Sequence, residues 1–158
     1  MNESILADAQ NDSTDGARCG LKIRAIIDEF QSAISAIEEC QRPVIGVAHN
    51  HSIGLALDIL SATDIRYCAR DVNFSIRVRH SANQEAAIGL AADIGTLQRF
   101  PKIVGNDSLT RELVYTARFF DAEEAERIGF VNRILDSPEA ALRAWTANKL
   151  LLSRQHLR

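Results

Sequence analysis

The sequence predicts an α/β domain, and three observations support that prediction. Segments with helical and strand-like spacing alternate along the 158 residues. Apolar residues make up 46% of the chain, which is enough for a globular core. No internal repeat or low-complexity tract interrupts the pattern. We place one domain at residues 19–158. Residues 1–18, polar and rich in Asp, Asn and Ser, are expected to form a disordered or irregular lead-in.

The first elements are a long helix and a buried strand. From Leu21 to about Cys40, apolar residues recur every three or four positions and predict one amphipathic helix. Pro43 favours an end to that helix. The short β-branched run "PVIGVA" (43–48) predicts a buried strand, and "HNHSIG" (49–54) predicts a turn.

The middle of the chain predicts a second helix and two further strands. Residues 54–63 form a short helical segment that is apolar on nearly all sides, so we expect it to be buried. Residues 64–69 and 73–78 have strand-like composition and are joined by a turn at 70–72. A polar loop follows at 79–84, and helical segments are predicted at about 95–103 and 107–117.

The last elements are predicted from their ends. Asp121 is a suitable N-cap, and Gly129 a suitable stop, for a helix that covers "DAEEAERIGF". "FVNRIL" (130–135) predicts a strand. Ser137 at an N-cap followed by Pro138 at the first helical position predicts a final helix over 137–155.

Charge and cysteine content argue against several classes of protein. A net charge of -3 with intermixed signs gives no footprint for nucleic acid or an anionic membrane. The apolar runs are too short to span a bilayer. Cys19, Cys40 and Cys68 form no CxxC pair, so we expect free thiols in a reducing compartment. Neither terminus shows a clear targeting signal.

Three acidic residues in apolar surroundings are the candidates for chemistry. Asp93 and Glu85 flank the run "AAIGLAA", and Asp58 lies within "GLALDIL". Burial raises a carboxyl pKa, and two carboxyls in one apolar pocket can then divide the roles of acid and base. Structural alternatives stay open: a helix N-cap for Asp93, a solvated loop acid for Glu85 and a hydrogen-bonded core acid for Asp58.

Two further features carry weaker signals. The turn that opens the helix in "SIGLALD" directs free backbone N–H groups outward, as an oxyanion site requires. His49 and His51 alternate as in a strand, but two ligands without a third are a poor metal site, and we expect no metal. The sequence contains no nucleophile elbow, P-loop or GxGxxG motif.

The stretches "RPVIGVAHNHSIGLALDILSATDIRYCARDVNFSIR" and "GLAADIGTLQRFPKIVGNDSL" resemble the crotonase (enoyl-CoA hydratase/isomerase) superfamily. Within it, "EAAIGLAADIGTLQRFPKIVG" is most similar to the Δ3,5-Δ2,4-dienoyl-CoA isomerases. The resemblance covers about residues 21–135. It implies a spiral of ββα units, assembled as trimers or hexamers, that acts on acyl-CoA thioesters in fatty-acid β-oxidation in peroxisomes or mitochondria. Coenzyme A is then part of the substrate, and no cofactor is implied.

The resemblance also implies roles for individual residues. Asp93 matches the catalytic aspartate of the family, Glu85 its catalytic glutamate and Asp58 the third acid of the pocket. Leu55 matches the residue whose backbone N–H is the second oxyanion donor. Substrate-binding positions correspond to the following glycines and leucine: Gly54, Gly89 and Leu90.

This chain departs from the family pattern in four places. The spiral is expected to be incomplete at the N-terminus, where the first oxyanion donor belongs, and the C-terminal helices are expected to be shortened. Residues 78–84 read as an insertion before Glu85. "EAAIG" has Ala where the family often has Val-Asp, and "HNHSIG" lacks a usual Gly. Two alternatives therefore stand beside the isomerase: enoyl-CoA hydratase activity, and a non-catalytic crotonase-like fragment or subunit.

Overall fold

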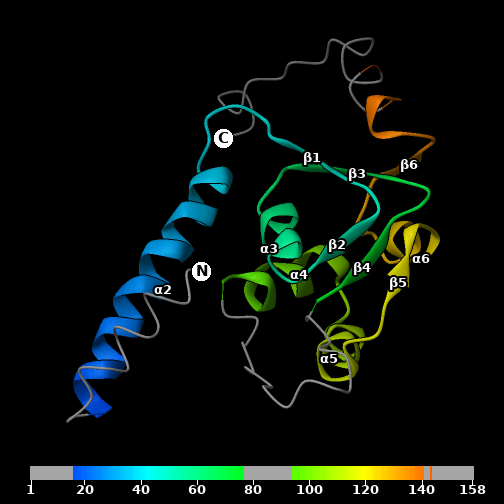
Figure 1. The fold of residues 1–158 in the computed structure, drawn as a ribbon. Helices are drawn as coiled ribbons and strands as arrows, with labels where there is room; N and C mark the ends of the chain where they lie inside the picture. Colours follow the sequence, from blue (N-terminus) through cyan, green and yellow to red (C-terminus); the bar gives the residue numbers. More distant parts are fainter. Residues whose placement is uncertain (1–15, 77–93, 141–142, 144–158) are drawn as a thin grey trace.

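The computed structural model describes residues 16–76, 94–140 and 143, and its strands form two small sheets (Figure 1). One sheet has the order β1-β3-β6, and all its pairs are parallel. The other has the order β2-β4-β5, with β2 parallel and β5 antiparallel to β4. The strands are β1 (Ile45–Ala48), β2 (His51–Ile53), β3 (Ile65–Ala69), β4 (Asn73–Ser75), β5 (Phe120–Asp121) and β6 (Arg133–Leu135).

The strands follow the chain as a spiral. β1 leads into β2 and then into helix α3 (Leu55–Ser61), after which β3 leads into β4. Each strand of the second turn pairs with its counterpart in the first, with Ile45 opposite Ile65 and His51 opposite Asn73. This stacking of strand–strand–helix units confirms the predicted α/β class and its ββα arrangement.

Three helices after the second turn close the core, and their caps follow from the local sequence. They are α4 (Thr96–Val104), α5 (Asp107–Thr116) and α6 (Ala122–Arg127). The side chain of Asp121 accepts a hydrogen bond from the Glu124 amide at 2.8 Å, which confirms the predicted N-cap of α6. Gly129 follows that helix with φ 78°, a conformation that favours glycine, and confirms the predicted stop.

Four phenylalanines form the centre of the core. The ring centroids of Phe74 and Phe120 are 5.2 Å apart, and those of Phe100 and Phe130 are 4.9 Å apart. All four side chains are buried and come from β4, α4, β5 and the chain before β6. The cluster therefore joins the second sheet to α4 and to the chain that enters β6, and burial of large aromatic rings contributes strongly to stability.

A buried arginine ties β3 to the chain that enters β6. The Arg66 guanidinium donates to the carbonyl of Phe130 at 2.6 Å and to that of Thr63 at 2.7 Å. Its backbone amide donates to Asn132 Oδ1 at 2.9 Å. Burial lowers the Arg66 pKa, and the nearby Asp64 carboxylate opposes that effect. These bonds satisfy polar groups that burial would otherwise leave unpaired.

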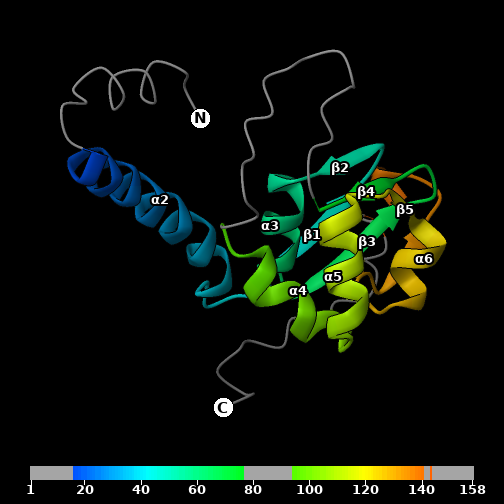
Figure 2. The same ribbon diagram turned by 90° about the horizontal axis from the view of Figure 1, so that it is seen from below.

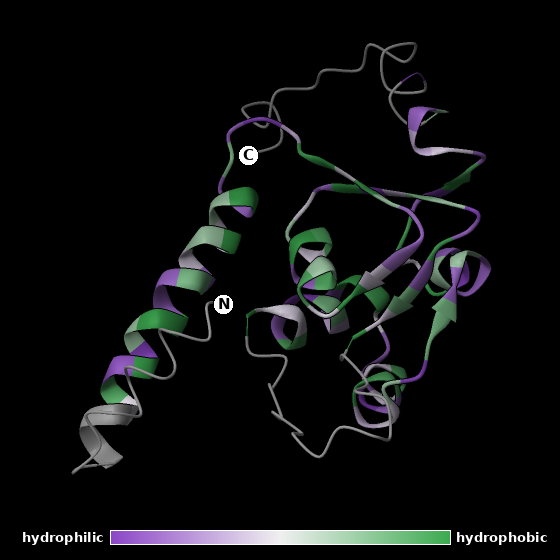
Figure 3. Ribbon diagram, viewed as in Figure 1, coloured by the Kyte–Doolittle hydropathy of each residue, from purple (hydrophilic) through white to green (hydrophobic). Residues whose placement is uncertain are grey.

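The long helix α2 (Gly16–Glu38) extends away from the two sheets (Figures 1 and 2). Figure 3 shows hydrophobic and hydrophilic residues intermixed along α2, whereas α3 is largely hydrophobic. The predicted amphipathic helix is confirmed, but it starts five residues earlier than Leu21. Residues 16–18 are thus helical, contrary to the predicted irregular lead-in, while residues 1–15 lie outside the described residues.

Two further predictions were wrong in detail. Part of the predicted turn at 49–54 is strand β2, because residues 51–53 find hydrogen-bonding partners on β4. Helix α3 is not buried on all sides, since Leu55 is 42% and Ile59 40% exposed.

The N-cap at Ser137 is confirmed by a 3.2 Å bond from the Ala140 amide to its hydroxyl. Most of the helix predicted over 137–155, like the loop at 79–84, lies outside the described residues.

Candidate active site

The start of α3 is built by a glycine that links it to the second sheet. Gly54 is the N-cap residue of α3, with φ 57° and ψ -114°, which strongly favours glycine. Its amide donates to the Ser75 carbonyl at the end of β4 at 2.9 Å. Its carbonyl accepts from the Leu57 amide at 2.8 Å and from the Asp58 amide at 3.4 Å. The turn predicted to open this helix is therefore held by the sheet.

This geometry gives the helix start donors of the kind that an oxyanion needs. The amides of the first residues of a helix have no partner within it, and in α3 these begin with Leu55. Leu55 as a residue is 42% exposed, so this end of α3 lies at the surface of the described part of the chain. Gly54 and Leu55, both predicted site residues, are thus adjacent at one end of α3.

Asp58 lies one turn further along α3, where it is buried and hydrogen-bonded. Only 4% of its surface is exposed to solvent. Oδ1 accepts from the Thr96 amide at 2.7 Å and from the Thr96 hydroxyl at 2.6 Å. The expectation that a buried acid in this apolar helix needs a partner is confirmed. Thr96 was not singled out in the sequence, because no local pattern relates residues 38 positions apart.

The start of α4 is fixed from a second direction. Its N-cap is Gly95, with φ 129°, which has no side chain to cap the helix; the Asp58 carboxylate instead accepts from the first helical amide, that of Thr96. The Arg99 guanidinium lies so close to Gly95 that a Cβ there would overlap it. Arg99 Nε donates to Glu38 Oε2 at 2.9 Å, and its terminal nitrogen donates to Ser35 Oγ at 3.0 Å. The α4 start therefore contacts both α3 and α2.

Four of the predicted site residues fall outside the described part of the chain. They are Glu85, Gly89, Leu90 and Asp93. The N-cap position of α4, which lies within the described residues, is occupied by Gly95. The catalytic roles of all four residues stay predictions.

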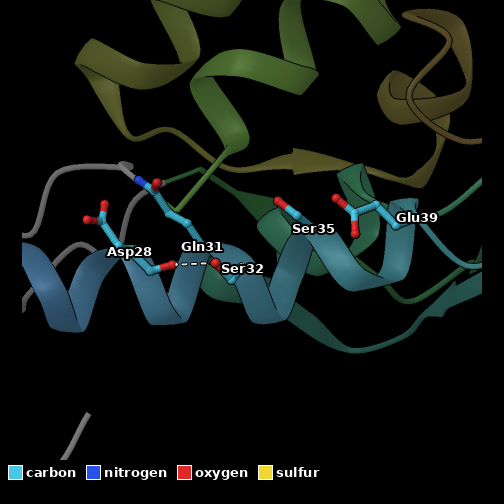
Figure 4. A pocket seen from close by; sticks show the side chains of 5 residues that line it. All are labelled: Asp28, Gln31, Ser32, Ser35 and Glu39. Atoms are coloured by element: carbon cyan, nitrogen blue, oxygen red, sulfur yellow. Dashed lines mark hydrogen bonds between the residues drawn. The ribbon is translucent and has the colours of Figure 1, made fainter.

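Two further features are the histidines and a surface groove. His51 Nδ1 is 2.6 Å from Asn50 Oδ1. Residues 16–76, 94–140 and 143 bring together no group of three His, Cys, Asp or Glu side chains able to hold a metal ion. A polar groove runs along α2, lined by Asp28, Gln31, Ser32, Ser35 and Glu39 (Figure 4). It contains none of the predicted site residues. Among the described helices, none is long and apolar enough to cross a membrane.

The described part of the chain is a mixed α/β spiral in which helix α3 begins at a glycine and carries a buried acid. These features agree with a known family of enzymes. The family model described as enoyl-CoA hydratase/isomerase matches residues 14–157. The chain belongs to the enoyl-CoA hydratase/isomerase family. A crystal structure of an enoyl-CoA hydratase/isomerase from Cupriavidus metallidurans CH34 is similar, with a TM-score of 0.69 and 26% identity. That match covers 91% of this chain and 49% of the other.

Curated relatives are more similar in sequence. The chain is 42% identical over 135 residues to the mitochondrial Delta(3,5)-Delta(2,4)-dienoyl-CoA isomerase of Mus musculus. It is 39% identical over 134 residues to the peroxisomal Delta(3,5)-Delta(2,4)-dienoyl-CoA isomerase of Arabidopsis thaliana. Each match covers 85% of this chain, but only 39% and 45% of the respective relative. The chain thus spans less than half the length of these relatives.

Proposed function

We propose that this chain carries acid/base machinery of a Δ3,5-Δ2,4-dienoyl-CoA isomerase. The observation that carries the proposal is the 42% identity, over 85% of the chain, to a relative with that name. The start of α3 and the buried acid Asp58 are compatible with it. Coenzyme A belongs to the substrate, and the proposed reaction needs no further cofactor.

The chemistry follows from the positions of the double bonds. Conversion of a 3,5-diene to a 2,4-diene breaks one C–H bond at C2, beside the thioester, and forms one at C6. Negative charge develops on the thioester oxygen in between, and hydrogen-bond donors placed there stabilise it. The Leu55 amide is the proposed donor from this chain. Proton removal and delivery need two groups held near the acyl chain, out of bulk water.

We assign those two groups to Glu85 and Asp93, as the family resemblance implies, and Asp58 to the third acid of the pocket. Gly54, Gly89 and Leu90 are proposed to contact the substrate. In this scheme, one group, as a carboxylate, removes the C2 proton, and the other, as a carboxylic acid, delivers a proton to C6. Proton exchange with solvent then returns both groups to their starting states and closes the cycle. Gly54 has φ 57°, which favours glycine, and its amide bond to Ser75 fixes the start of α3.

We also propose that the protein works as a homo-oligomer in mitochondria or peroxisomes. The organelles are those in the names of the relatives from Mus musculus and Arabidopsis thaliana. Large apolar side chains exposed on α3 and α4 fit association between copies: Leu55, Ile59 and Leu97. Light scattering of the purified chain measures the oligomer size. A trimer or hexamer supports this part of the proposal, and a monomer contradicts it.

The test of the proposed activity compares two substrates on one preparation. A 3,5-dienoyl-CoA gains ultraviolet absorbance as the conjugated 2,4-dienoyl thioester forms, and a 2-enoyl-CoA loses absorbance if it is hydrated. The isomerase proposal predicts a change with the first substrate and little with the second. Turnover of the enoyl-CoA alone would instead favour a hydratase. Failure of the folded protein to act on either would favour a non-catalytic subunit, and co-assembly with an intact homologue would then be measured.

A further inference from the structure

The bond between Asp58 and Thr96 joins two buried side chains on different helices. Asp58 is 4% and Thr96 1% exposed. Both hydrogen bonds from Thr96 end on Oδ1 of the carboxylate, at 2.7 and 2.6 Å. Two donors on one oxygen fix the rotation of a carboxylate that would otherwise turn about its last side-chain bond. Neither of these two bonds uses Oδ2.

Thr96 is itself held in place by the contacts of the α4 start. Arg99, one turn later, has only 14% of its side chain exposed, and its guanidinium lies against Gly95. On its other side, the guanidinium binds Ser35 and Glu38 at the end of α2. A continuous set of contacts therefore runs from α2 through Arg99 and Gly95 to Thr96, and from there to Asp58.

We propose that Thr96 is a positioning residue for the reaction, acting through the carboxylate of Asp58, and that Arg99 in turn fixes Thr96. The proposal rests on the proposed function, in which Asp58 is the third acid of the pocket. A carboxylate that is already held in one orientation needs no free energy for reorientation when the acyl chain binds. Small displacements of such groups are costly, since about 1 Å of misplacement can reduce a rate about 100-fold.

A purely structural role of Thr96 as a helix-start residue makes a different prediction. It would lower stability when removed, and it would change turnover only as far as the folded fraction falls. A positioning role lowers kcat of the folded enzyme and leaves KM nearly unchanged, because the acyl-CoA contacts are untouched. The two roles are therefore separated by kinetics measured at known folded fraction.

The experiment compares Thr96→Val, which removes the hydroxyl at nearly constant shape, with Thr96→Ser, which keeps it. We expect Thr96→Val to lower kcat by roughly ten- to 100-fold, with KM within about twofold. Thr96→Ser should retain kcat within about threefold. Val131→Ala, a cavity variant before β6, controls for lost stability, since Val131 is buried but outside the proposed site. A kcat in Thr96→Val equal to that of the control would overturn the proposal, as would an equal loss in Thr96→Ser.

A second measurement separates this inference from the proposed function. The amide proton of Thr96, bonded to a carboxylate, should resonate downfield in the ¹H–¹⁵N spectrum of the wild type and move upfield in Asp58→Asn. An unmoved resonance would contradict the contact itself. A wild type that binds but does not convert the dienoyl-CoA would contradict both the proposed function and the positioning role of Thr96. An active wild type, together with an unchanged kcat in Thr96→Val, would contradict only the positioning role of Thr96.

Discussion

The carboxylate of Asp58 and the amide and hydroxyl of Thr96 form one hydrogen-bonded unit between α3 and α4, with distances of 2.7 and 2.6 Å. A double-mutant cycle with Asp58→Ala and Thr96→Val, followed by urea unfolding, measures the coupling between the carboxylate and the Thr96 hydroxyl, since valine keeps the backbone amide. We expect a coupling free energy of about 2 kcal/mol, because hydrogen bonds to a buried charged group exceed neutral ones. The exposed pair Asp107 and Arg111, at 2.8 Å, is the control and should couple by less than about 0.5 kcal/mol. Equal coupling in both pairs would contradict the buried unit.

The conformation of Gly95 predicts a second result. Gly95→Ala should lower the free energy of unfolding by about 2 kcal/mol, because φ 129° is strained for any residue with a Cβ. The new methyl group must also displace the Arg99 guanidinium from its bonds to Ser35 and Glu38. Gly20→Ala is the matched control, since nothing lies within 4 Å of that position in α2. Alanine there should stabilise by up to about 1 kcal/mol. Thermal melts of both variants measure the change in stability, which should be a loss for Gly95→Ala and a gain for Gly20→Ala.

The ion pair between Arg118 and Glu124 predicts a pH dependence of stability. The bond from Arg118 lowers the Glu124 pKa below its ordinary value of 4.5. The carboxylate therefore stabilises the fold above about pH 4.5, and that contribution disappears as the pH falls through the lowered pKa of the folded state. Glu124→Gln should cost about 1 kcal/mol at pH 7, since the pair is partly exposed, and progressively less in acid.

The control for this pair is Glu123→Gln. Its carboxylate binds Arg70 at 3.1 Å, but both side chains are more than half exposed, at 59% and 65%. Urea unfolding should show a change within about 0.5 kcal/mol at either pH. If Glu124→Gln lowers the free energy of unfolding by the same amount at pH 7 and in acid, packing of Glu124, rather than its charge, stabilises the fold.

Cys68 is predicted to be unreactive in the folded protein. Its thiol is 0% exposed, and burial raises its pKa to about 12, with Glu126, Glu123 and Asp71 adding to the effect. Because the thiolate is the reactive form, a thiol reagent should label Cys68 only when the chain unfolds. A variant with Cys19→Ser and Cys40→Ser leaves Cys68 as the one thiol that the reagent can label. Rapid stoichiometric labelling under native conditions would contradict the burial.

Local signals in the sequence predicted several elements well. The N-cap Asp121 and the stop at Gly129 identify α6 from adjacent residues alone. Strand β2 was missed, because "HNHSIG" has turn composition and becomes a strand only through pairing with β4. The exposure of Leu55 and Ile59 was missed for a similar reason: an apolar run does not specify which side faces solvent.

The candidate site was predictable only in part. The apolar surroundings of Asp58 indicated that it needed a partner, but not that the partner is Thr96. Gly54 was expected at a turn, and its positive φ gives the physical reason for glycine. Arg99 carries no local signal, since its partners Ser35 and Glu38 belong to a helix more than 60 residues earlier. Contacts of this kind arise from the tertiary fold.

The most direct test of the proposed activity is the conversion of a 3,5-dienoyl-CoA to its 2,4-isomer, measured by the ultraviolet absorbance of the conjugated product. Purified wild type is compared with Asp93→Asn and Glu85→Gln at equal folded fraction. We expect turnover by the wild type and a loss of at least about 100-fold in each variant, the scale typical of lost acid/base catalysis. Wild-type turnover that survives both substitutions would contradict the assignment of the acid pair. A folded wild type without turnover would contradict the proposed activity.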